Sequence, residues 1–366
     1  MGSKIDLYRV DWIFLAVALA IIGLGLPFLK SSATPSDFNR QLVWLGVGLA
    51  ALIFFTVVDY HLWIRYAYWL YAGSILLLLI VLFAPAINNA HSYLRVGPVG
   101  MQPAELFKFT LIIALARHMG KRENQHMLHG LIIPFALTLG PTILILKQPD
   151  LGTALTIPPI LFATLWASGA RFSHLAGCIL LGLASIWPMW QYGMKPYQKA
   201  RIFAFFDPEK YESAEAYQLL MSLTAIGSGG VSGMGLGNGV ITDLNLLPEK
   251  HNDFIFGVIA EEGGFAASGS MILLFLVLAL IGLHIAWASA DRFGRILATG
   301  VAVIIGWQAI LNIYVVTGLF PTTGVTLPLV SYGGSSLVVT CSMIGIVLNV
   351  SQSRPTLDKL ENPDRI

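Results

Sequence analysis

Charged side chains are scarce in this chain. Of its 366 residues, 11% are Asp, Glu, Lys or Arg, while 56% are hydrophobic. A soluble domain carries about 25% charged residues, so this composition argues against an ordinary soluble protein and indicates a membrane protein. The net charge of +2 gives no reason to expect a nucleic-acid partner.

Cysteine and metal-binding patterns are also sparse. The two cysteines, Cys178 and Cys341, lie inside apolar runs, which favours packing in the interior over a disulfide or a metal site. His126 and His129 have a spacing that could hold a metal ion on a helix, but they lie in a basic loop, so no metal site is predicted. The sequence shows neither a repeat of fixed period nor a low-complexity tract.

Long apolar runs, by contrast, are abundant. A helix needs about 20 predominantly apolar residues to cross a bilayer, and ten segments approach this length. The expected spans are residues 11–30, 41–59, 64–85, 103–119, 128–147, 151–170, 174–193, 262–288, 293–319 and 331–352. The sequence therefore predicts an all-α polytopic integral membrane protein with about ten transmembrane helices, forming a single membrane domain over residues 1–366. The fourth span is the weakest, because it is short and contains Glu105 and Lys108.

Lys and Arg are divided unequally between the two sides of this bundle. Twelve of them fall on one side, and four fall on the short loops of the other side. Short cytoplasmic loops are enriched in Lys and Arg, so both termini are expected in the cytoplasm, with residues 353–366 as a cytoplasmic tail. Residues 194–252, between the seventh and eighth spans, then form a large extracytoplasmic loop. Loops of this length are usually functional, and Glu215 to Ile226 is expected to form a short amphipathic helix on the membrane surface.

Ionisable residues gather where this loop meets the eighth span, in the stretch Leu247 to Phe256. The stretch contains Glu249, His251 and Asp253. Asp253 precedes three apolar residues, so desolvation is expected to raise its pKa, and a carboxylate near neutrality can act as a general base. The competing interpretation is a helix N-cap, since Asp before an apolar helix satisfies free backbone N–H groups.

Four further candidates also have two interpretations. Glu105 and Lys108 are three residues apart, so they either form an ion pair within a helix or face a substrate. Arg201 either binds a phosphate or pyrophosphate bidentately or is a solvated loop charge. Asp150 follows Pro149 in a turn between two spans, where capping the next helix is the favoured interpretation.

Two segments rich in Pro and Gly differ in their expected roles. Pro321 to Ser336 contains residues typical of a broken or re-entrant backbone, which membranes tolerate beside protein or a water-filled cavity. Asn312, inside the ninth span, needs a polar partner there. Ile226 to Gly239 is glycine-rich but fits no nucleotide-binding pattern, so its glycines are expected to allow tight turns and close backbone approach.

Five motifs, in this order, resemble those of the SEDS family of bacterial peptidoglycan polymerases, the FtsW/RodA type. They are Gln102 to Lys108, Pro149 to Thr153, Ala225 to Gly230, Leu247 to Phe256, and Ser331 to Ser335. The similarity covers nearly the whole chain. Pro321 to Pro328 and Gly235 to Asn238 resemble the division branch of the family, FtsW, more than the elongation branch.

The resemblance implies a glycosyltransferase in the bacterial cytoplasmic (inner) membrane that polymerises lipid II during septal or elongation cell-wall synthesis. It assigns catalysis to Asp253. It assigns substrate-binding or cavity roles to Glu105, Lys108 and Arg201. Substrate-binding or cavity roles are also expected for four residues within the matching motifs, Glu249, His251, Asp150 and Ser331. It implies a class B penicillin-binding protein and other divisome or elongasome membrane proteins as partners, and it leaves a divalent cation, Mg²⁺ or Mn²⁺, open.

The chain departs from the family pattern in three places. Met221 stands where a Gln is common. Ser92 and Tyr93 stand where the family usually has Arg-Trp, and Asn252 replaces a small hydroxyl residue before Asp253. Two other functions remain open on the sequence: a lipid II transporter (flippase) and a non-catalytic divisome scaffold. Transport predicts charged residues near mid-membrane, whereas the polar motifs gather toward the outer face, which favours chemistry there.

Overall fold

The computed structural model describes residues 9–83, 93–96, 99–122, 124–194, 196–207 and 214–353. All ten expected spans are helical. They are α1 (Trp12–Ser32), α2 (Pro35–Val57), α3 (His61–Leu82), α4 (Pro103–Gly120), α5 (Ile132–Lys147), α6 (Leu151–Ala167), α7 (Phe172–Pro188), α11 (Ile255–Trp287), α12 (Arg292–Val316) and α13 (Gly334–Gln352). Within the described residues, eight helical segments are long and apolar enough to cross a membrane; α6 is apolar but shorter.

Several of these helices begin where side chains satisfy the free backbone amides of the first turn. Asp11 accepts a hydrogen bond from Phe14 N, and Thr34 accepts one from Asp37 N. Asp291 does the same for α12 through Gly294 N. Such caps fix where each apolar segment starts, which is why the spans begin close to the predicted residues.

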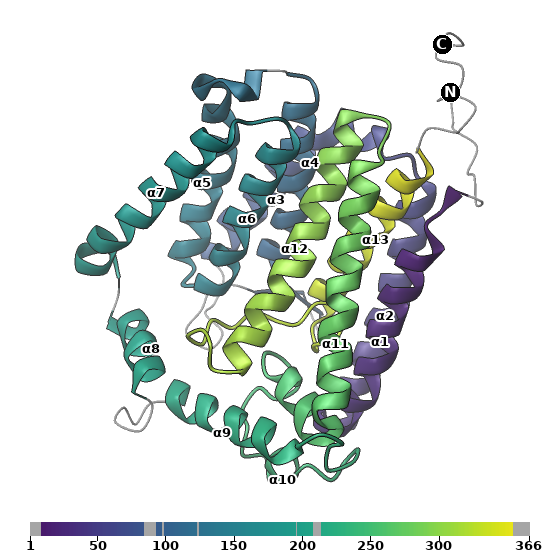
Figure 1. The fold of residues 1–366 in the computed structure, drawn as a ribbon, viewed down its shortest axis with the longest axis vertical. Coiled ribbons are helices and arrows are strands. Elements are labelled where there is room, and N and C mark those ends of the chain that lie inside the picture. Colours follow the sequence, from purple (N-terminus) through teal and green to yellow (C-terminus); the bar gives the residue numbers. More distant parts are fainter. Residues whose placement is uncertain are drawn as a thin grey trace.

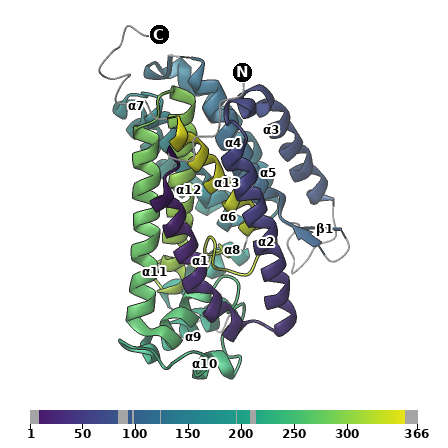
Figure 2. The same ribbon diagram turned by 90° about the vertical axis from the view of Figure 1, so that its right-hand side faces the viewer.

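The weakest predicted span, α4, lies at the centre of the bundle. It packs against α3, α6, α12 and α13, and its residues are buried along almost the whole helix. Its charged residues therefore face protein and not lipid, which is where membrane proteins tolerate them. Figures 1 and 2 show α11, α12 and α13 beside this core, with α1 and α2 on one side.

Small residues bring α2 and α13 close together. A side chain at Gly345 would lie 2.4 Å from Leu52 O, and one at Gly48 would lie 3.1 Å from the sulfur of Cys341. Close packing over small residues is the usual basis of helix association in membranes. The prediction that Cys341 is a packing residue is confirmed, since the thiol is free and buried.

Helix α7 stands apart from the bundle. Figure 1 shows it leaning away from α6, and Leu175 is the single buried residue within Phe172–Pro188. Leu181 is 72% exposed and Trp187 is 68% exposed. An apolar helix exposed on nearly all sides fits a lipid environment.

The segment predicted as a large loop contains three helices: α8 (Pro196–Phe206), α9 (Ala214–Gly229) and α10 (Val240–Asp243). They lie along one end of the bundle in Figure 1. The helix expected at 215–226 is confirmed as part of α9. Its buried face packs against α11, and Ser222 donates a hydrogen bond of 2.8 Å to Val316 O of α12.

Helix α11 begins at Ile255, earlier than the predicted start at 262, and breaks at Gly264, where φ is +63°. The glycine-rich segment before α10 fills this break. Phe265 N donates to Gly230 O at 2.9 Å, and Ala266 N donates to Val231 O at 3.0 Å. A side chain at Gly233 would lie 2.1 Å from Glu262 O, so the expectation of close backbone approach is confirmed.

A short hairpin, β1 (Leu94–Val96) and β2 (Val99–Met101), precedes α4 and was not predicted. Ser92, one of the departures from the family pattern, lies outside the described residues, as does the tail from 354 onward. The first turn of α1 and the end of α13 meet, since Asp11 N donates to the hydroxyl of Ser351 at 3.2 Å.

Candidate functional site

Asp253 lies in the turn that leads into α11. Its carboxylate faces the loop between α12 and α13: a side chain at Gly324 would lie 3.5 Å from Asp253 Oδ2. The N-cap residue of α11 is Phe254, and no side chain caps this helix. The interpretation of Asp253 as a helix cap is therefore wrong, because its oxygens do not accept from the free amides of α11.

The electrostatic surroundings of Asp253 favour its protonated form. Burial, followed by the negative charges of Glu249 and Asp150, raises the pKa of Asp253 to about 7, and the charge of Arg201 acts in the opposite direction. The carboxyl is nevertheless only half-buried, so it remains accessible. Charges from the turn before α11, the start of α6 and helix α8 thus act on one carboxylate.

The backbone around Asp253 is held by donors from α12 and the loop that follows it. Asn312 Nδ2 donates to Asp253 O at 2.7 Å and to Val325 O at 2.6 Å. Ser331 Oγ donates to Asn252 O at 2.6 Å and accepts from Leu327 N at 2.8 Å. These bonds confirm that Asn312 has polar partners and show that Ser331 fixes the backbone beside the carboxylate.

Replacement of Asn312 by Ala is expected to lower the stability of the protein. Two carbonyl oxygens would lose their donor in a buried setting, and an unsatisfied buried group costs about 1–3 kcal/mol. Thermal unfolding of the purified variant measures the effect. The control is Thr317→Ala at the end of the same helix. The hydroxyl of Thr317 donates only to backbone carbonyls of α12 itself. Equal unfolding temperatures for the two variants would contradict this role of Asn312.

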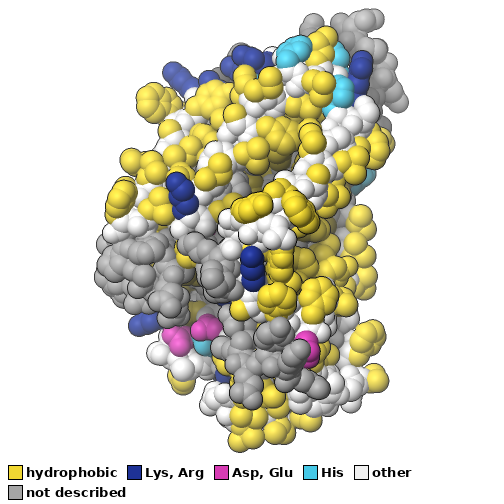
Figure 3. Space-filling model, turned by 90° about the vertical axis from the view of Figure 1, so that its left-hand side faces the viewer, with side chains coloured by type: hydrophobic (Ala, Val, Ile, Leu, Met, Phe, Trp, Pro, Cys, Tyr) yellow, Lys and Arg dark blue, Asp and Glu magenta, His cyan; other side chains and the backbone are white. Residues whose placement is uncertain are grey.

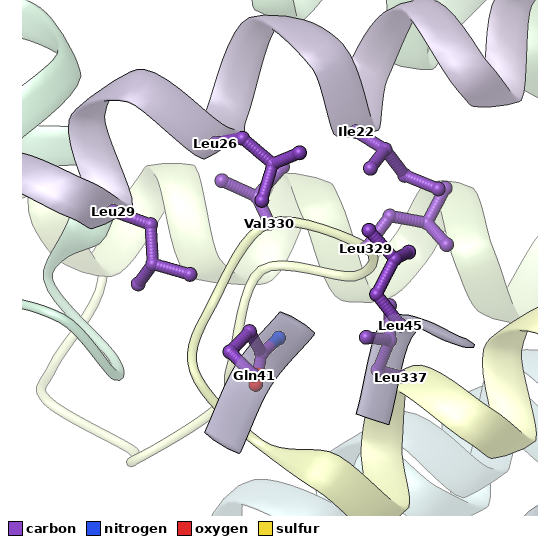
Figure 4. A pocket seen from close by; sticks show the side chains of 8 residues that line it. All are labelled: Ile22, Leu26, Leu29, Gln41, Leu45, Leu329, Val330 and Leu337. Carbon is purple, nitrogen blue, oxygen red and sulfur yellow. The ribbon is translucent and has the colours of Figure 1, made fainter. Parts of the chain in front are cut away.

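Gln41 of α2 also holds the loop between α12 and α13 through its side chain. Its side-chain amide donates to Ser331 O and accepts from Gly333 N, both at 3.2 Å. Figure 4 shows Gln41 amid apolar side chains of α1, α2, α13 and the loop. The cavity there measures about 10 Å³, room for roughly one water molecule. It is a packing gap and not a substrate pocket.

Asp150 caps α6, as predicted. Its oxygens accept from Thr153 N at 2.9 Å, from Thr153 Oγ1 at 2.8 Å and from Gln102 Nε2 at 2.9 Å. Burial raises the pKa of Asp150 even though these donors act to lower it. The first turn of α6 also touches the loop, because a side chain at Gly152 would lie 2.3 Å from Thr323 O.

Glu105 and Lys108 form the ion pair that their spacing predicts. Lys108 Nζ lies 2.8 Å from Glu105 Oε1, and both residues are buried in α4. Lys108 also donates to Gln308 Oε1 at 3.0 Å, and Gln308 Nε2 donates to Thr326 O at 3.3 Å. The pair thus supports, through α12, the loop that faces Asp253.

The remaining candidates lie nearer the surface. Glu249 is exposed, has a left-handed backbone with φ +54°, and accepts a hydrogen bond from the side chain of Asn252. The His251 ring contacts the Tyr332 ring at 5.6 Å between centroids, and His251 O accepts from Tyr332 N at 2.8 Å. The side chain of Arg201 is partly buried in α8.

The sequence interpretation did not select three side chains that this geometry makes important. Gln41 and Gln308 hold the loop, as described above. The charges of Asp253 and Asp150 act on Tyr93, which places this tyrosine, 42% exposed, near the same group of carboxylates. An amide inside an apolar span was the available signal for Gln41 and Gln308. For Tyr93 the signal was its position at a departure from the family pattern.

The match to a family model decides the relationship of the chain to known proteins. The model described as cell cycle protein, of the FtsW, RodA and SpoVE type, matches residues 12–356. The chain belongs to this family. An alignment of 363 residues with the probable peptidoglycan glycosyltransferase FtsW of Geobacter sp. (strain M18) shows 35% identity and covers 95% of this chain and 98% of that protein. Stage V sporulation protein E of Bacillus subtilis (strain 168) is 33% identical over 361 residues, covering 93% of this chain and 97% of that protein.

Solved structures of the FtsW/RodA family share the fold. A chain from a study of the structural coordination of polymerization and crosslinking by a peptidoglycan synthase complex is 33% identical. Its TM-score is 0.82, covering 93% of this chain and 97% of that one. The rod shape determining protein RodA of Thermus thermophilus is 31% identical with a TM-score of 0.71, covering 95% of this chain and 98% of that one. The predicted SEDS fold is therefore confirmed.

Proposed function

We propose that this member of the FtsW/RodA family is a peptidoglycan glycosyltransferase that polymerises lipid II, with Asp253 as its general base. The observation that carries the assignment is a half-buried carboxylate that caps no helix and has a pKa raised to about 7. A base with a pKa near the working pH is ionised often enough to act and basic enough to accept a proton. The names of the FtsW relatives support the same reaction.

In the proposed reaction, Asp253 accepts the proton of the sugar 4-hydroxyl of one lipid II. The oxygen of that hydroxyl attacks the anomeric carbon of a second chain. The bond from that carbon to the pyrophosphate oxygen breaks, and undecaprenyl pyrophosphate leaves with the electron pair. Arg201 is the candidate to bind the pyrophosphate, because its charge already acts on Asp253 and a guanidinium binds phosphate oxygens bidentately.

A divalent cation would fit beside Asp253 only with phosphate oxygens among its ligands. Within the described part of the chain, no group of three His, Cys, Asp or Glu side chains could hold a metal ion. Magnesium commonly uses one or two carboxylates together with substrate phosphates, so one accessible carboxylate is compatible with that arrangement.

The proposed orientation places the Asp253 end of the bundle outside the cytoplasmic membrane of a bacterium. The start of α1 and the end of α13 lie at the other end, so both termini and the tail 353–366 are cytoplasmic. The bias of Lys and Arg toward that end supports this topology. Residues 194–252, with α8, α9 and α10, are then extracytoplasmic.

The proposed partner is a class B penicillin-binding protein that crosslinks the new glycan, together with other divisome or elongasome membrane proteins. The similarity to a chain from a peptidoglycan synthase complex that joins polymerization to crosslinking supports such a partner. The similarity to FtsW relatives supports a role in septal synthesis.

Polymerisation of labelled lipid II by the purified full-length protein, alone and with its cognate penicillin-binding protein, tests the function. Long glycan strands would support a polymerase. Movement of lipid II across a vesicle membrane without strand formation would indicate a flippase. Absence of both, with the partner shown to be bound, would indicate a scaffold.

The polymerisation rate is expected to rise with pH between about pH 6 and pH 8. The base must be ionised to accept a proton, and a carboxyl with a pKa of about 7 is mostly protonated at pH 6 and mostly ionised at pH 8. Single-turnover rates at saturating lipid II measure this dependence. A rate that is constant from pH 5 to pH 8 would contradict a base with this pKa.

A further inference from the structure

A second cavity, lined by both charged and apolar residues, lies at the end of the bundle opposite Asp253. It measures about 240 Å³ and is formed where α3 begins, α4 ends and α12 begins. Its walls include Ile64, Arg117, Lys121, Asp291, Arg292 and Phe293. The polymerase mechanism uses none of these residues.

Among the described residues, three cations and one carboxylate line the cavity, so positive charges outnumber negative ones there. The carboxylate of Asp291 already serves as the N-cap of α12. Its Oδ1 accepts from the Tyr60 hydroxyl at 2.5 Å, and both of its oxygens accept from Gly294 N. These donors fix the carboxylate but leave its charge in place; the site favours an anion because the three lining cations outnumber it.

The two arginines are held in place by uncharged acceptors. Arg117 donates to Ile64 O and Arg65 O of α3. Arg292 donates to Ser168 O at 2.6 Å and to Gln125 Oε1 at 3.0 Å. Such bonds fix the positions of the guanidinium groups, so the groups are ordered before a ligand arrives. Lys121 is exposed at the rim of the cavity, and its chain can adjust to the bound group.

Aromatic side chains indicate the level of this cavity in the membrane. On α3, Tyr66 is 44% exposed, Tyr68 is 40% exposed and Trp69 is 79% exposed. The Arg117 guanidinium lies 4.8 Å from the centroid of the Tyr68 ring. Exposed Tyr and Trp gather at the headgroup level of a bilayer, where lipid phosphates lie. In Figure 3, Lys and Arg side chains line the upper edge of the face shown, above a hydrophobic surface.

We propose that this cavity binds the phosphate headgroup of an anionic phospholipid. The charge selects an anion, and the level of the aromatic side chains selects a lipid as its source. Basic pockets between transmembrane helices on the cytoplasmic side are a recurring site for anionic headgroups. In this site Lys121 contacts the lipid phosphate. Arg117 and Arg292, whose positions are fixed by their hydrogen bonds, line the inner side of the cavity.

Native mass spectrometry of the full-length protein, titrated with phosphatidylglycerol or phosphatidylethanolamine at one ionic strength, tests the proposal. We expect the wild type to retain phosphatidylglycerol preferentially. Lys121→Gln should weaken phosphatidylglycerol binding about fivefold, the effect of one basic residue near a lipid phosphate. The matched control, Arg171→Gln, removes an exposed cation that lies before α7 and outside the cavity, and should bind like the wild type.

Two results would overturn the proposal. One is an equal effect of Lys121→Gln and Arg171→Gln, or no preference of the wild type for phosphatidylglycerol, since the cavity would then not select the lipid. The other comes from a parallel titration with inorganic phosphate. If phosphate binds with the same dependence on Lys121 while phosphatidylglycerol does not, the ligand is a soluble anion and the lipid assignment is wrong.

Discussion

The Asp253→Asn variant is expected to polymerise lipid II about 10²–10⁴-fold more slowly than the wild type, the usual contribution of a general base. Asparagine has nearly the volume of aspartate but accepts no proton at neutral pH. The hydrogen bonds that hold this segment involve Asp253 O and not its side chain, so the loop contacts remain. Single-turnover polymerisation of labelled lipid II, with the partner present, measures the change in rate.

The stability of the same variant distinguishes lost chemistry from lost folding. A folded-state pKa raised from 3.8 to about 7 means that folding disfavours the ionised carboxyl, so this group costs stability progressively as pH rises from about 4 to 7, and the full cost applies at pH 8. Asp253→Asn should therefore unfold at the same or a higher temperature than the wild type at pH 8. The matched control is Asp243→Asn, an exposed aspartate on α10, which should polymerise at the wild-type rate. Near-normal glycan synthesis by folded Asp253→Asn protein would contradict the assignment of Asp253 as the general base.

Loss of one partner of the Glu105–Lys108 pair is expected to produce the largest change in stability. Lys108→Met would leave the Glu105 carboxylate buried without its cation, and breaking a buried ion pair in this way costs about 3–5 kcal/mol. The loop facing Asp253 should loosen as well, because Lys108 also binds Gln308. Unfolding of purified variants in one detergent, followed by temperature or denaturant, measures the cost.

A double-mutant cycle separates the interaction free energy of the pair from the effect of each single substitution. Glu105→Gln combined with Lys108→Met removes both charges and should recover most of the stability lost in Lys108→Met. The chain provides a surface control in Asp37 and Arg40 of α2, also three residues apart, with a separation of 3.9 Å and an Arg side chain 60% exposed. An exposed pair contributes at most about 1 kcal/mol. A cost for Lys108→Met no greater than that for Arg40→Met would contradict the structural role of the buried pair.

Local sequence patterns predicted much of the fold. Apolar length predicted the helical spans, because a bilayer sets a minimum length; within the described residues eight segments meet it on their own, whereas α6 is shorter and α4 is not among them. Capping residues such as Asp150 could also be predicted, since a cap depends on residues within one turn. The start of α11 was predicted at 262 instead of Ile255, because this part of the helix depends on residues far away in the chain. Its break at Gly264 exists because distant backbone carbonyls at 230 and 231 accept the freed amides.

In the candidate site, too, some features follow from the local sequence and others from the tertiary structure alone. The sequence alone determined that Asp253, followed by apolar residues, would be a poorly solvated carboxyl at the end of a helical span, since desolvation there follows from neighbouring residues. It also determined the spacing that pairs Glu105 with Lys108. Only the tertiary structure decided that Asp253 is no cap, and that Asp150, Glu249 and Arg201 set its charge environment. It also decided that Asn312 and Gln41 hold the surrounding backbone. These depend on contacts between residues far apart in the chain, and the energies of such contacts arise from packed geometry that no local pattern encodes.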